Sequence, residues 1–307
     1  MNDLRIIFMG TPEFAVPSLE ILIENKFNVV AVITAPDKPQ GRGQKITFSP
    51  VKESALKHNI TVLQPTNLKA PEFLEELKSY RANIQVVVAF RMLPEVVWAM
   101  PSFGTFNLHA SLLPQYRGAA PINWAIINGE KETGATTFFL KQEIDTGSII
   151  FQEKEPIRDE DNVGSLYERL MLKGAQLVLK TIQAIASGNY PSIPQPQELE
   201  IKHAPKIFKE TCEINWNQPS EKVRNFVRGL SPYPAAWTKF NDKVFKIYSI
   251  ASVTKNSENK KPGEYATDNK TYLNVKTADG WVSIKELQPE GKKRLRVDDF
   301  FRGNKMG

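Results

Sequence analysis

At the centre of the chain stands the stretch NLHASLLPQYRG, residues 107–118. It continues the run GTF at 104–106, and together the two read as the end of a β-strand followed by a loop rich in turn residues. Side chains two residues apart on a strand point to the same face, so Asn107 and His109 project together while Leu108 points away. Open α/β sheets keep their sites where a strand ends in a loop. We therefore expect an amide and an imidazole to share one site here.

The residues before this stretch alternate between strand-like and helix-like patterns. Residues 84–90 are nearly all apolar, as expected for a central parallel strand covered on both faces. These patterns predict a Rossmann-like domain with a mostly parallel sheet. The first strand runs into Met9-Gly10-Thr11-Pro12-Glu13-Phe14, which has one glycine where a dinucleotide fingerprint needs three, so NAD binding is disfavoured. Residues 34–48 show neither the alternation of a strand nor the periodicity of a helix, and we expect a solvent-facing loop there.

The composition changes after a long helical pattern at 163–187. Residues 189–206 contain four prolines and few large apolar residues, which predicts a linker. Beyond it, short strand-like runs alternate with turn residues, as in a small β-barrel. We expect an N-terminal domain at 1–188, the linker at 189–206 and a C-terminal domain at 207–307.

Several motifs carry a resemblance that covers nearly the whole chain. The run at 107–114 with Arg117-Gly118 and the later Asp145-Thr146-Gly147 resembles the signature of formyltransferases that use 10-formyltetrahydrofolate. The likeness begins at MGTPEFA, residues 9–15, and extends to PYPA, residues 232–235. The resemblance implies a Rossmann-like catalytic domain followed by a smaller OB-like barrel. In its C-terminal motifs and its length, the chain resembles the branch of these enzymes that formylates methionine on charged initiator tRNA. That reaction is a step of translation initiation.

The resemblance implies a catalytic set. Asn107 and His109 would hold the oxyanion and return a proton to the leaving nitrogen, and Asp145 would orient His109 and relay the amine proton. A lone Asp-Thr-Gly copy does not suit an aspartic protease, which needs two carboxylates. The cofactor-binding residues implied are Ser111, Leu112, Leu113, Pro114, Phe90, Arg91 and Met92. At 90–92 this chain departs from the glycine-containing segment of its relatives, whose backbone meets the pterin.

The charge distribution favours a polyanionic partner. Residues 1–206 hold 21 Lys and Arg against 22 Asp and Glu, whereas residues 207–307 hold 19 against 12. A basic second half suits nucleic acid, and the resemblance implies tRNA. Lys38, Arg42 and Lys45 would meet the RNA from the segment 34–48.

The remaining expectations concern the cellular location, the metal content, the oligomeric state and the alternative functions. The single cysteine and the lack of a signal-like N-terminus indicate a cytoplasmic protein without membrane segments. We expect no metal, because the three histidines lack ligand spacing, and we expect a monomer. Three alternatives stay open: an amino-sugar nucleotide formyltransferase, a formyltetrahydrofolate hydrolase, and a non-catalytic RNA-binding protein.

Overall fold

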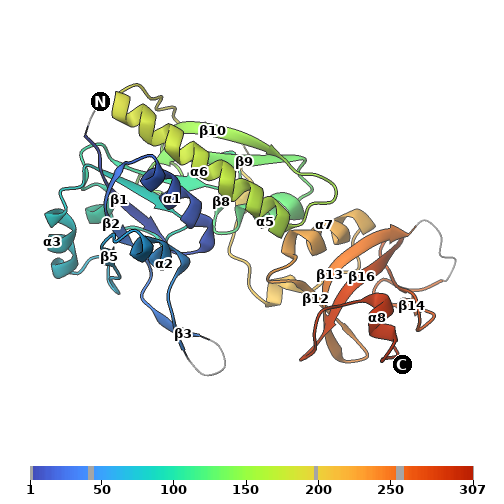
Figure 1. Cartoon of the computed structure of the whole chain (residues 1–307). Helices are drawn as coiled ribbons and strands as arrows, with labels where there is room; N and C mark the ends of the chain where they lie inside the picture. Colours follow the sequence, from blue (N-terminus) through green and yellow to red (C-terminus); the bar gives the residue numbers. More distant parts are fainter. Residues whose placement is uncertain (1–2, 41–44, 197–199, 254–258, 307) are drawn as a thin grey trace. The chain divides into compact units, whose positions relative to one another are not determined.

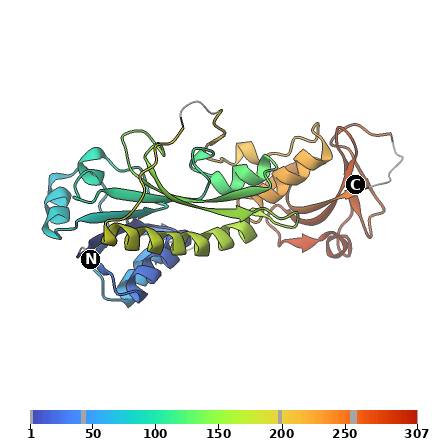
Figure 2. The ribbon, with the colours of Figure 1, turned by 90° about the horizontal axis from the view of Figure 1, so that it is seen from above.

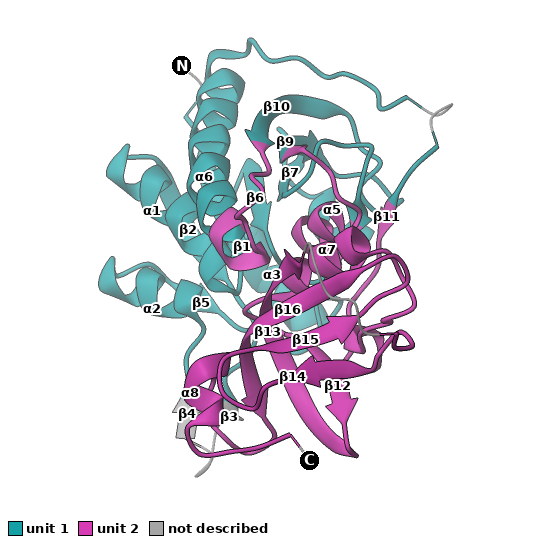
Figure 3. Ribbon diagram, turned by 90° about the vertical axis from the view of Figure 1, so that its right-hand side faces the viewer, with its two compact units in different colours: residues 1–117, 134–155, 167–202 teal, residues 118–133, 156–166, 203–307 magenta. Residues whose placement is uncertain are grey.

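The computed structural model describes residues 3–40, 45–196, 200–253 and 259–306. Contacts between residues divide the chain into two compact units, shown in two colours in Figure 3. Unit 1 comprises residues 1–117, 134–155 and 167–202, and unit 2 comprises 118–133, 156–166 and 203–307. The units are built from discontinuous stretches, whereas we expected two continuous domains joined by a linker. That expected division remains a prediction.

Unit 1 is built on a seven-stranded sheet with the order β10-β9-β7-β6-β1-β2-β5. Pairing is parallel from β5 through β2, β1 and β6 to β7, and β9 joins β7 antiparallel. The strands are β1 (Arg5–Gly10), β2 (Asn28–Ile33), β5 (Val62–Leu63), β6 (Ile84–Val88), β7 (Thr105–His109), β9 (Glu132–Phe139) and β10 (Ile149–Pro156). The sequence expectation of a mostly parallel α/β sheet is confirmed.

Helices cover both faces of this sheet. Figure 2 shows the sheet edge-on, with α1, α2 and α6 on one side of it. On the other face an apolar cluster joins Ile7 and Met9 of β1 to Phe73 and Val97 of α3 and α4. The helices are η1 (Glu13–Ala15), α1 (Val16–Glu24), α2 (Pro50–Lys57), α3 (Pro71–Ser79), α4 (Glu95–Trp98) and α6 (Val163–Ser187). Fully buried strand residues such as Phe8 and Phe106 form the core between the layers.

One expectation for unit 1 is wrong in detail. The segment at 34–48 was expected to be a loop, but it carries the antiparallel strands β3 (Lys38–Gln40) and β4 (Lys45–Thr47) (Figure 1). Proline is tolerated in such a pair because a two-stranded ribbon consists only of edges. We call these two strands the ribbon.

Unit 2 contains a six-stranded antiparallel sheet of the kind expected for the C-terminal barrel. An apolar cluster joins that sheet to α7, with Val223 and Val227 facing Ile247 and Ile284. The elements are α5 (Pro121–Ile127), β8 (Arg117–Gly118, in which the unit begins), β11 (His203–Ala204), η2 (Glu210–Cys212), α7 (Ser220–Leu230), β12 (Ala236–Phe240), β13 (Lys243–Val253), β14 (Tyr265–Thr267), β15 (Leu273–Lys276), β16 (Trp281–Pro289), β17 (Leu295–Arg296) and α8 (Val297–Phe301).

A buried arginine explains why residues 156–166 belong to unit 2. Arg228 of α7 is 8% exposed and donates hydrogen bonds to the carbonyl oxygens of Arg158, at 3.0 Å, and Asp161, at 3.2 Å. Asn225 accepts a third bond, at 2.8 Å. Burial of a guanidinium is costly unless its donors are satisfied, so these bonds hold the 156–166 segment against α7.

Candidate active site

The ends of three parallel strands meet at one edge of the unit 1 sheet. Strand order reverses between β1 and β6, since the chain proceeds from β1 to β2 and β5 on one side and from β6 to β7 on the other. Gly10 pairs with Val88, and Val88 pairs with Leu108, so β1, β6 and β7 end side by side. Ligands of open α/β sheets bind at such a switch point. His109, the last residue of β7, therefore stands where a substrate site is expected.

Close packing requires the glycine in the first of these turns. A Cβ atom at Gly10 would lie 2.7 Å from the Cβ of Ala15 and 3.0 Å from the Val88 carbonyl oxygen. Real side chains do not approach so closely, so Gly10 lets η1 pack directly beside the end of β6. This account of the glycine needs no nucleotide, in line with the disfavoured NAD site.

Asn107 and His109 project from the face of β7 opposite α6. Leu108 faces the helix, because a Cβ added at Gly174 of α6 would lie 2.7 Å from its Cδ2 atom. Alternation along the strand places Asn107 and His109 on the other face. His109 is 7% exposed and Asn107 is half-buried. Within the described ranges no hydrogen bond is formed by the carboxamide of Asn107, which leaves its N–H donors available to a ligand.

The two ring nitrogens of His109 have different surroundings. Nε2 lies 2.8 Å from the backbone carbonyl oxygen of Tyr116, and because a carbonyl can only accept, Nε2 donates. Nδ1 lies 3.9 Å from Oδ2 of Asp145. The side chains of His109 and Asp145 are 8% and 12% exposed. The tautomer is thereby fixed: neutral His109 carries its proton on Nε2 and presents the Nδ1 lone pair beside the carboxylate.

The loop that carries Asp145 has an unusual backbone. Asp145 has φ +55°, a left-handed value that is uncommon outside glycine. Two residues later, a Cβ at Gly147 would lie 1.5 Å from the carbonyl oxygen of Phe139. The glycine of the Asp-Thr-Gly motif therefore allows the loop to pass against the end of β9. Tyr116, whose carbonyl binds His109, also has a positive φ, of 60°. Non-glycine residues in this region cluster at functional sites.

Gln195 belongs to the same site and was missed by the sequence analysis, which placed it in the linker. It is 8% exposed, accepts from the Arg117 guanidinium, and donates to the carbonyl oxygens of Asp145 and Gly147. Arg117 is thus a partner of Gln195. The only local signal is that prolines at 194 and 196 restrict the backbone on both sides.

The predicted cofactor-binding run at 111–114 is held tightly by its neighbours. Ser111 is fully buried, and its hydroxyl donates to the Gln115 carbonyl oxygen at 2.6 Å. Leu113 packs against Phe138 and Ile149. Pro114 is buried and Leu112 is half-buried. The side chains of Ser111 and Leu113 thus hold the loop in place. That residues 111–114 bind a folate remains a prediction, and such binding would use mainly their backbone groups.

Phe90, Arg91 and Met92 follow β6 at the same sheet edge. Arg91 donates to the carbonyl oxygens of Thr66, at 3.1 Å, and of Pro65. Its guanidinium also lies over the ring of Phe90, 5.7 Å from the centroid. Met92 is 72% exposed. The Arg91 side chain is therefore turned toward residues 65–66, and recognition of the pterin by the 90–92 backbone remains a prediction.

Two of the residues predicted to meet RNA, Lys38 and Lys45, belong to the ribbon. Lys38 is exposed, only the backbone of Lys45 is described, and Arg42 lies outside the described residues. At the foot of the ribbon, the Lys52 ammonium lies 2.5 Å from Asp37 and 2.8 Å from the Gln64 side-chain oxygen. This side-chain cluster ties the start of β3 to α2.

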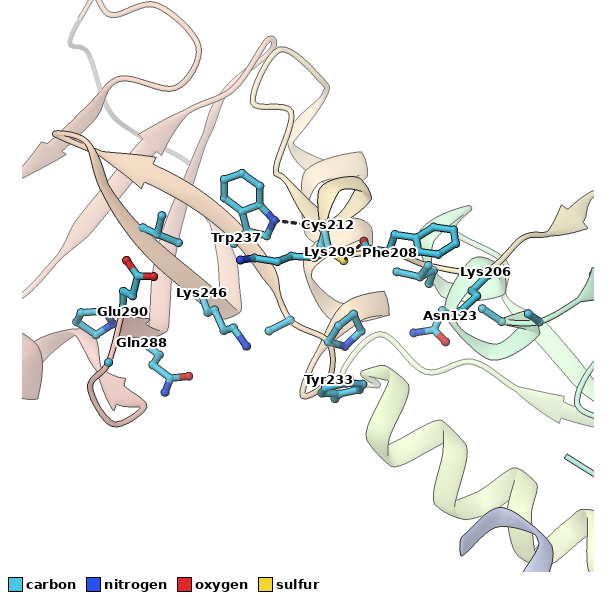
Figure 4. Close-up of a pocket in the computed structure, with 18 residues that line it drawn as sticks. Asn123, Lys206, Phe208, Lys209, Cys212, Tyr233, Trp237, Lys246, Gln288 and Glu290 are labelled. Atoms are coloured by element: carbon cyan, nitrogen blue, oxygen red, sulfur yellow. Dashed lines mark hydrogen bonds between the residues drawn. The ribbon is translucent and has the colours of Figure 1, made fainter. Parts of the chain in front are cut away.

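Unit 2 contains a basic and aromatic pocket of about 690 Å³ (Figure 4). Tyr233, 81% exposed, and Phe208, 54% exposed, are the most open of its rings. The indole of Trp237 donates to the Lys209 carbonyl oxygen at 2.8 Å. The cationic and aromatic residues that line the pocket are Lys206, Lys209, Lys246, Phe208, Tyr233 and Trp237. Cations beside exposed rings suit phosphates and bases.

Across residues 3–40, 45–196, 200–253 and 259–306, no three or more His, Cys, Asp or Glu side chains are grouped so that they could hold a metal ion. Over the same ranges, every helix is too short or too polar to cross a bilayer.

Comparison with known proteins decides the family. Residues 4–182 match the formyl transferase family and residues 206–305 match the formyl transferase C-terminal domain. A methionyl-tRNA formyltransferase of Bacteroides fragilis is 55% identical over 310 residues, which cover 98% of this chain and 95% of the relative. The chain belongs to the methionyl-tRNA formyltransferase family. Another member, from Flavobacterium johnsoniae, is 51% identical over 99% of this chain and 97% of its own length.

A solved structure from outside the methionyl-tRNA formyltransferase family shares the fold. The N-formyltransferase of Helicobacter canadensis, solved with folinic acid and dTDP-3-aminofucose, has a TM-score of 0.68 at 22% identity. The match covers 95% of this chain and all of the other. At this identity the likeness concerns the fold alone.

Proposed function

We propose that this chain transfers the formyl group of 10-formyltetrahydrofolate to the α-amino group of methionine on charged initiator tRNA. Membership of the family supports this reaction. The geometry of the site at the end of β7 supports the choice of catalytic residues. The observation that carries the proposal is the pairing of His109 with Asp145, in which Nε2 is anchored by Tyr116 and Nδ1 faces the carboxylate. The protein acts in the cytoplasm, as a monomer, at translation initiation.

The reaction makes one carbon–nitrogen bond and breaks another. The amine attacks the formyl carbon, a tetrahedral intermediate with a negative oxygen forms, and its collapse expels N10 of the folate. An α-amino group has a pKa of about 7.7–8.0, so much of it is already neutral near pH 7.5. The demanding steps are stabilising the oxyanion and moving the proton from the attacking amine to N10.

Asn107 and His109 meet these two demands. The uncommitted N–H donors of Asn107 point to the same side of β7 as the imidazole and would bind the oxyanion, an interaction worth about 10²–10³ in rate. Nδ1 of His109 accepts the amine proton, Asp145 stabilises the imidazolium, and Nδ1 returns the proton to N10. Nε2 stays bonded to Tyr116 throughout, so the ring does not turn between the two transfers.

The binding residues follow from the same edge of the sheet. The backbone at 111–114 and at 90–92 borders the end of β7 and β6 and would hold the folate. Lys38 and Lys45 of the ribbon, together with Arg42, would contact the RNA near its aminoacylated end. The pocket of unit 2 would bind RNA through its three lysines and exposed rings.

A comparison of formyl acceptors tests this function. Purified protein is given 10-formyltetrahydrofolate with methionyl initiator tRNA, free methionine, an amino-sugar nucleotide or water. We expect transfer to the charged tRNA alone, and loss of that transfer in His109→Ala. Transfer to the sugar, or formate release without an acceptor, would be consistent with the fold but would contradict the assignment of charged tRNA as the substrate. Wild-type tRNA binding with no transfer at all would favour a non-catalytic RNA-binding protein.

A further inference from the structure

Gln195 is a buried side chain whose carboxamide uses its full bonding capacity. Oε1 accepts from Nε of Arg117 at 3.2 Å and from its terminal nitrogen at 2.6 Å. Nε2 donates to the carbonyl oxygen of Asp145 at 2.8 Å and to that of Gly147 at 2.9 Å. An amide has two donor hydrogens and two acceptor lone pairs, and all four are used here.

These bonds admit one orientation of the amide. If the carboxamide were turned over, its N–H groups would face the donors of Arg117 and its oxygen would face two carbonyl oxygens. Glutamate in this place could accept from Arg117 but has nothing to donate to the loop, and methionine can do neither. Asparagine is one methylene shorter and could not reach both sides. The site therefore calls for glutamine specifically.

The carbonyls that Gln195 binds belong to the loop that carries the Asp145 carboxylate. Residues 141–144 of this loop are exposed, so few other contacts hold its outer part. The two bonds fall on either side of Thr146, whose own hydroxyl bonds within the loop to the Glu143 carbonyl oxygen. The pair of bonds from Gln195 thus holds the backbone at Asp145 and Gly147, and with it the carboxylate beside His109.

The segment around Gln195 also holds the other partner of His109. We call residues 193–196 with 200–202 the strap. Ile193 of the strap exchanges backbone hydrogen bonds with Ile149, at 2.8 and 2.9 Å. The Lys202 carbonyl oxygen accepts from the backbone N–H of Tyr116 at 2.6 Å. Tyr116 offers its own carbonyl to His109 Nε2, so the strap fixes the surroundings of both ring nitrogens.

We propose that Gln195 is a positioning residue for formyl transfer, which sets the separation of His109 and Asp145 by holding the 145–147 loop to the strap. This inference rests on the proposed function, because it assigns Gln195 a role through Asp145. It predicts that Gln195 affects the chemical step and not the binding of either substrate.

Two substitutions separate this role from that of a partner for Arg117. Gln195→Glu keeps an acceptor for Arg117 and replaces two donors by a negative oxygen facing carbonyls, while Gln195→Met removes every bond. We expect kcat to fall about 10²-fold in both, since a displacement of about 1 Å can cost that much. Both KM values should stay within about threefold. Gln85→Met, a buried glutamine of β6 away from the loop, controls for loss of stability.

Wild-type kcat in Gln195→Glu would overturn the proposal, because Gln195 would then serve only Arg117. So would a fall of kcat in Gln85→Met as large as that in Gln195→Met, since the effect would then be general destabilisation. Thermal unfolding of each variant confirms that the proteins compared are folded.

A double-mutant cycle with Asp145→Ala tests whether Gln195 acts through the carboxylate. If it does, Gln195→Met lowers the single-turnover rate less than about threefold in the Asp145→Ala background. Additive losses would overturn the proposal. If the wild type formylates an acceptor other than charged tRNA, the proposed function fails, but the same cycle measured with that acceptor still decides the role of Gln195.

Discussion

Nδ1 of His109 lies 3.9 Å from Oδ2 of Asp145, while Nε2 of the same ring donates to Tyr116. The first distance is too long for a direct hydrogen bond and short enough for a strong charge interaction once the ring is protonated. One ring nitrogen is thus bonded to the backbone, and the other faces the carboxylate, where we expect proton transfer to occur.

The glycine of the Asp-Thr-Gly motif offers a steric test of the loop. Gly147→Ala would place a Cβ 1.5 Å from the Phe139 carbonyl oxygen, so the loop and the Asp145 carboxylate must move. We expect kcat to fall at least about 10²-fold and the melting temperature to drop. Gly303→Ala is the control, because nothing lies within 4 Å of a Cβ there. Unchanged kcat in Gly147→Ala would mean that the loop position is irrelevant to catalysis.

Arg91 offers a test of the folate side. Arg91→Met removes the donors that hold the 90–92 backbone to Pro65 and Thr66, so that backbone loses its fixed position. We expect the KM for 10-formyltetrahydrofolate to rise about tenfold with little change in kcat, as for a loss of uniform binding. Lys69→Met, at a nearby exposed position, should leave both constants unchanged. A normal KM in Arg91→Met would remove this segment from the folate site.

We expect the contact between Asp37 and Lys52 at the foot of the ribbon to weaken in acid. The pKa of Asp37 lies below its ordinary value, chiefly because the Lys52 ammonium donates a hydrogen bond to the carboxylate and Gln64 donates a second. A depressed pKa in the folded state contributes stability above the ordinary value of about 3.9, and this contribution is lost as the pH falls through the folded value.

Asp37→Asn should therefore lower the urea midpoint of unfolding at about pH 6, and the difference from the wild type should shrink as the solution is acidified. Glu75→Gln, which removes one partner of the exposed Lys78 pair, serves as the control for loss of a surface charge. A difference between the wild type and Asp37→Asn that does not change with pH would contradict the ion-pair explanation.

We expect the basic pocket of unit 2 to make tRNA affinity depend on salt. Replacing Lys206, Lys209 and Lys246 by glutamine removes three counterion-releasing contacts and should reduce the slope of log Kd against log salt by about 2. The matched control changes Lys57, Lys69 and Lys78 of unit 1, with the same loss of net charge. Equal slopes for the two triple variants would show that the pocket does not contact phosphates.

The sequence predicts the parts of the site that obey a local rule. Asn107 and His109 follow from strand alternation and from the loop after them, and the apolar run at 84–90 predicts a buried parallel strand. Asp145 needed the family resemblance, because a lone Asp-Thr-Gly motif is equally compatible with a turn that the Asp side chain caps. Its backbone conformation and its closeness to His109 arise only when β7 and the 145–147 loop meet.

Gln195 shows why the rest could not be predicted. Its partners are 78 and 50 residues away, at Arg117 and Asp145, and no periodicity links them. The prolines on both sides of Gln195 indicate a lack of regular structure, and a proline-rich segment of this kind predicts a linker. The strands of the ribbon were missed for a related reason, since each is three residues long and shows no alternation.

Single-turnover formyl transfer decides whether His109 and Asn107 carry the chemistry. With 10-formyltetrahydrofolate and methionyl initiator tRNA both saturating, product release and binding do not limit the rate. We predict that His109→Ala and Asn107→Ala each lower the rate constant by at least about 10²-fold while tRNA affinity stays at the wild-type value. Rate constants within about threefold of the wild type in folded variants would contradict the assignment of these residues.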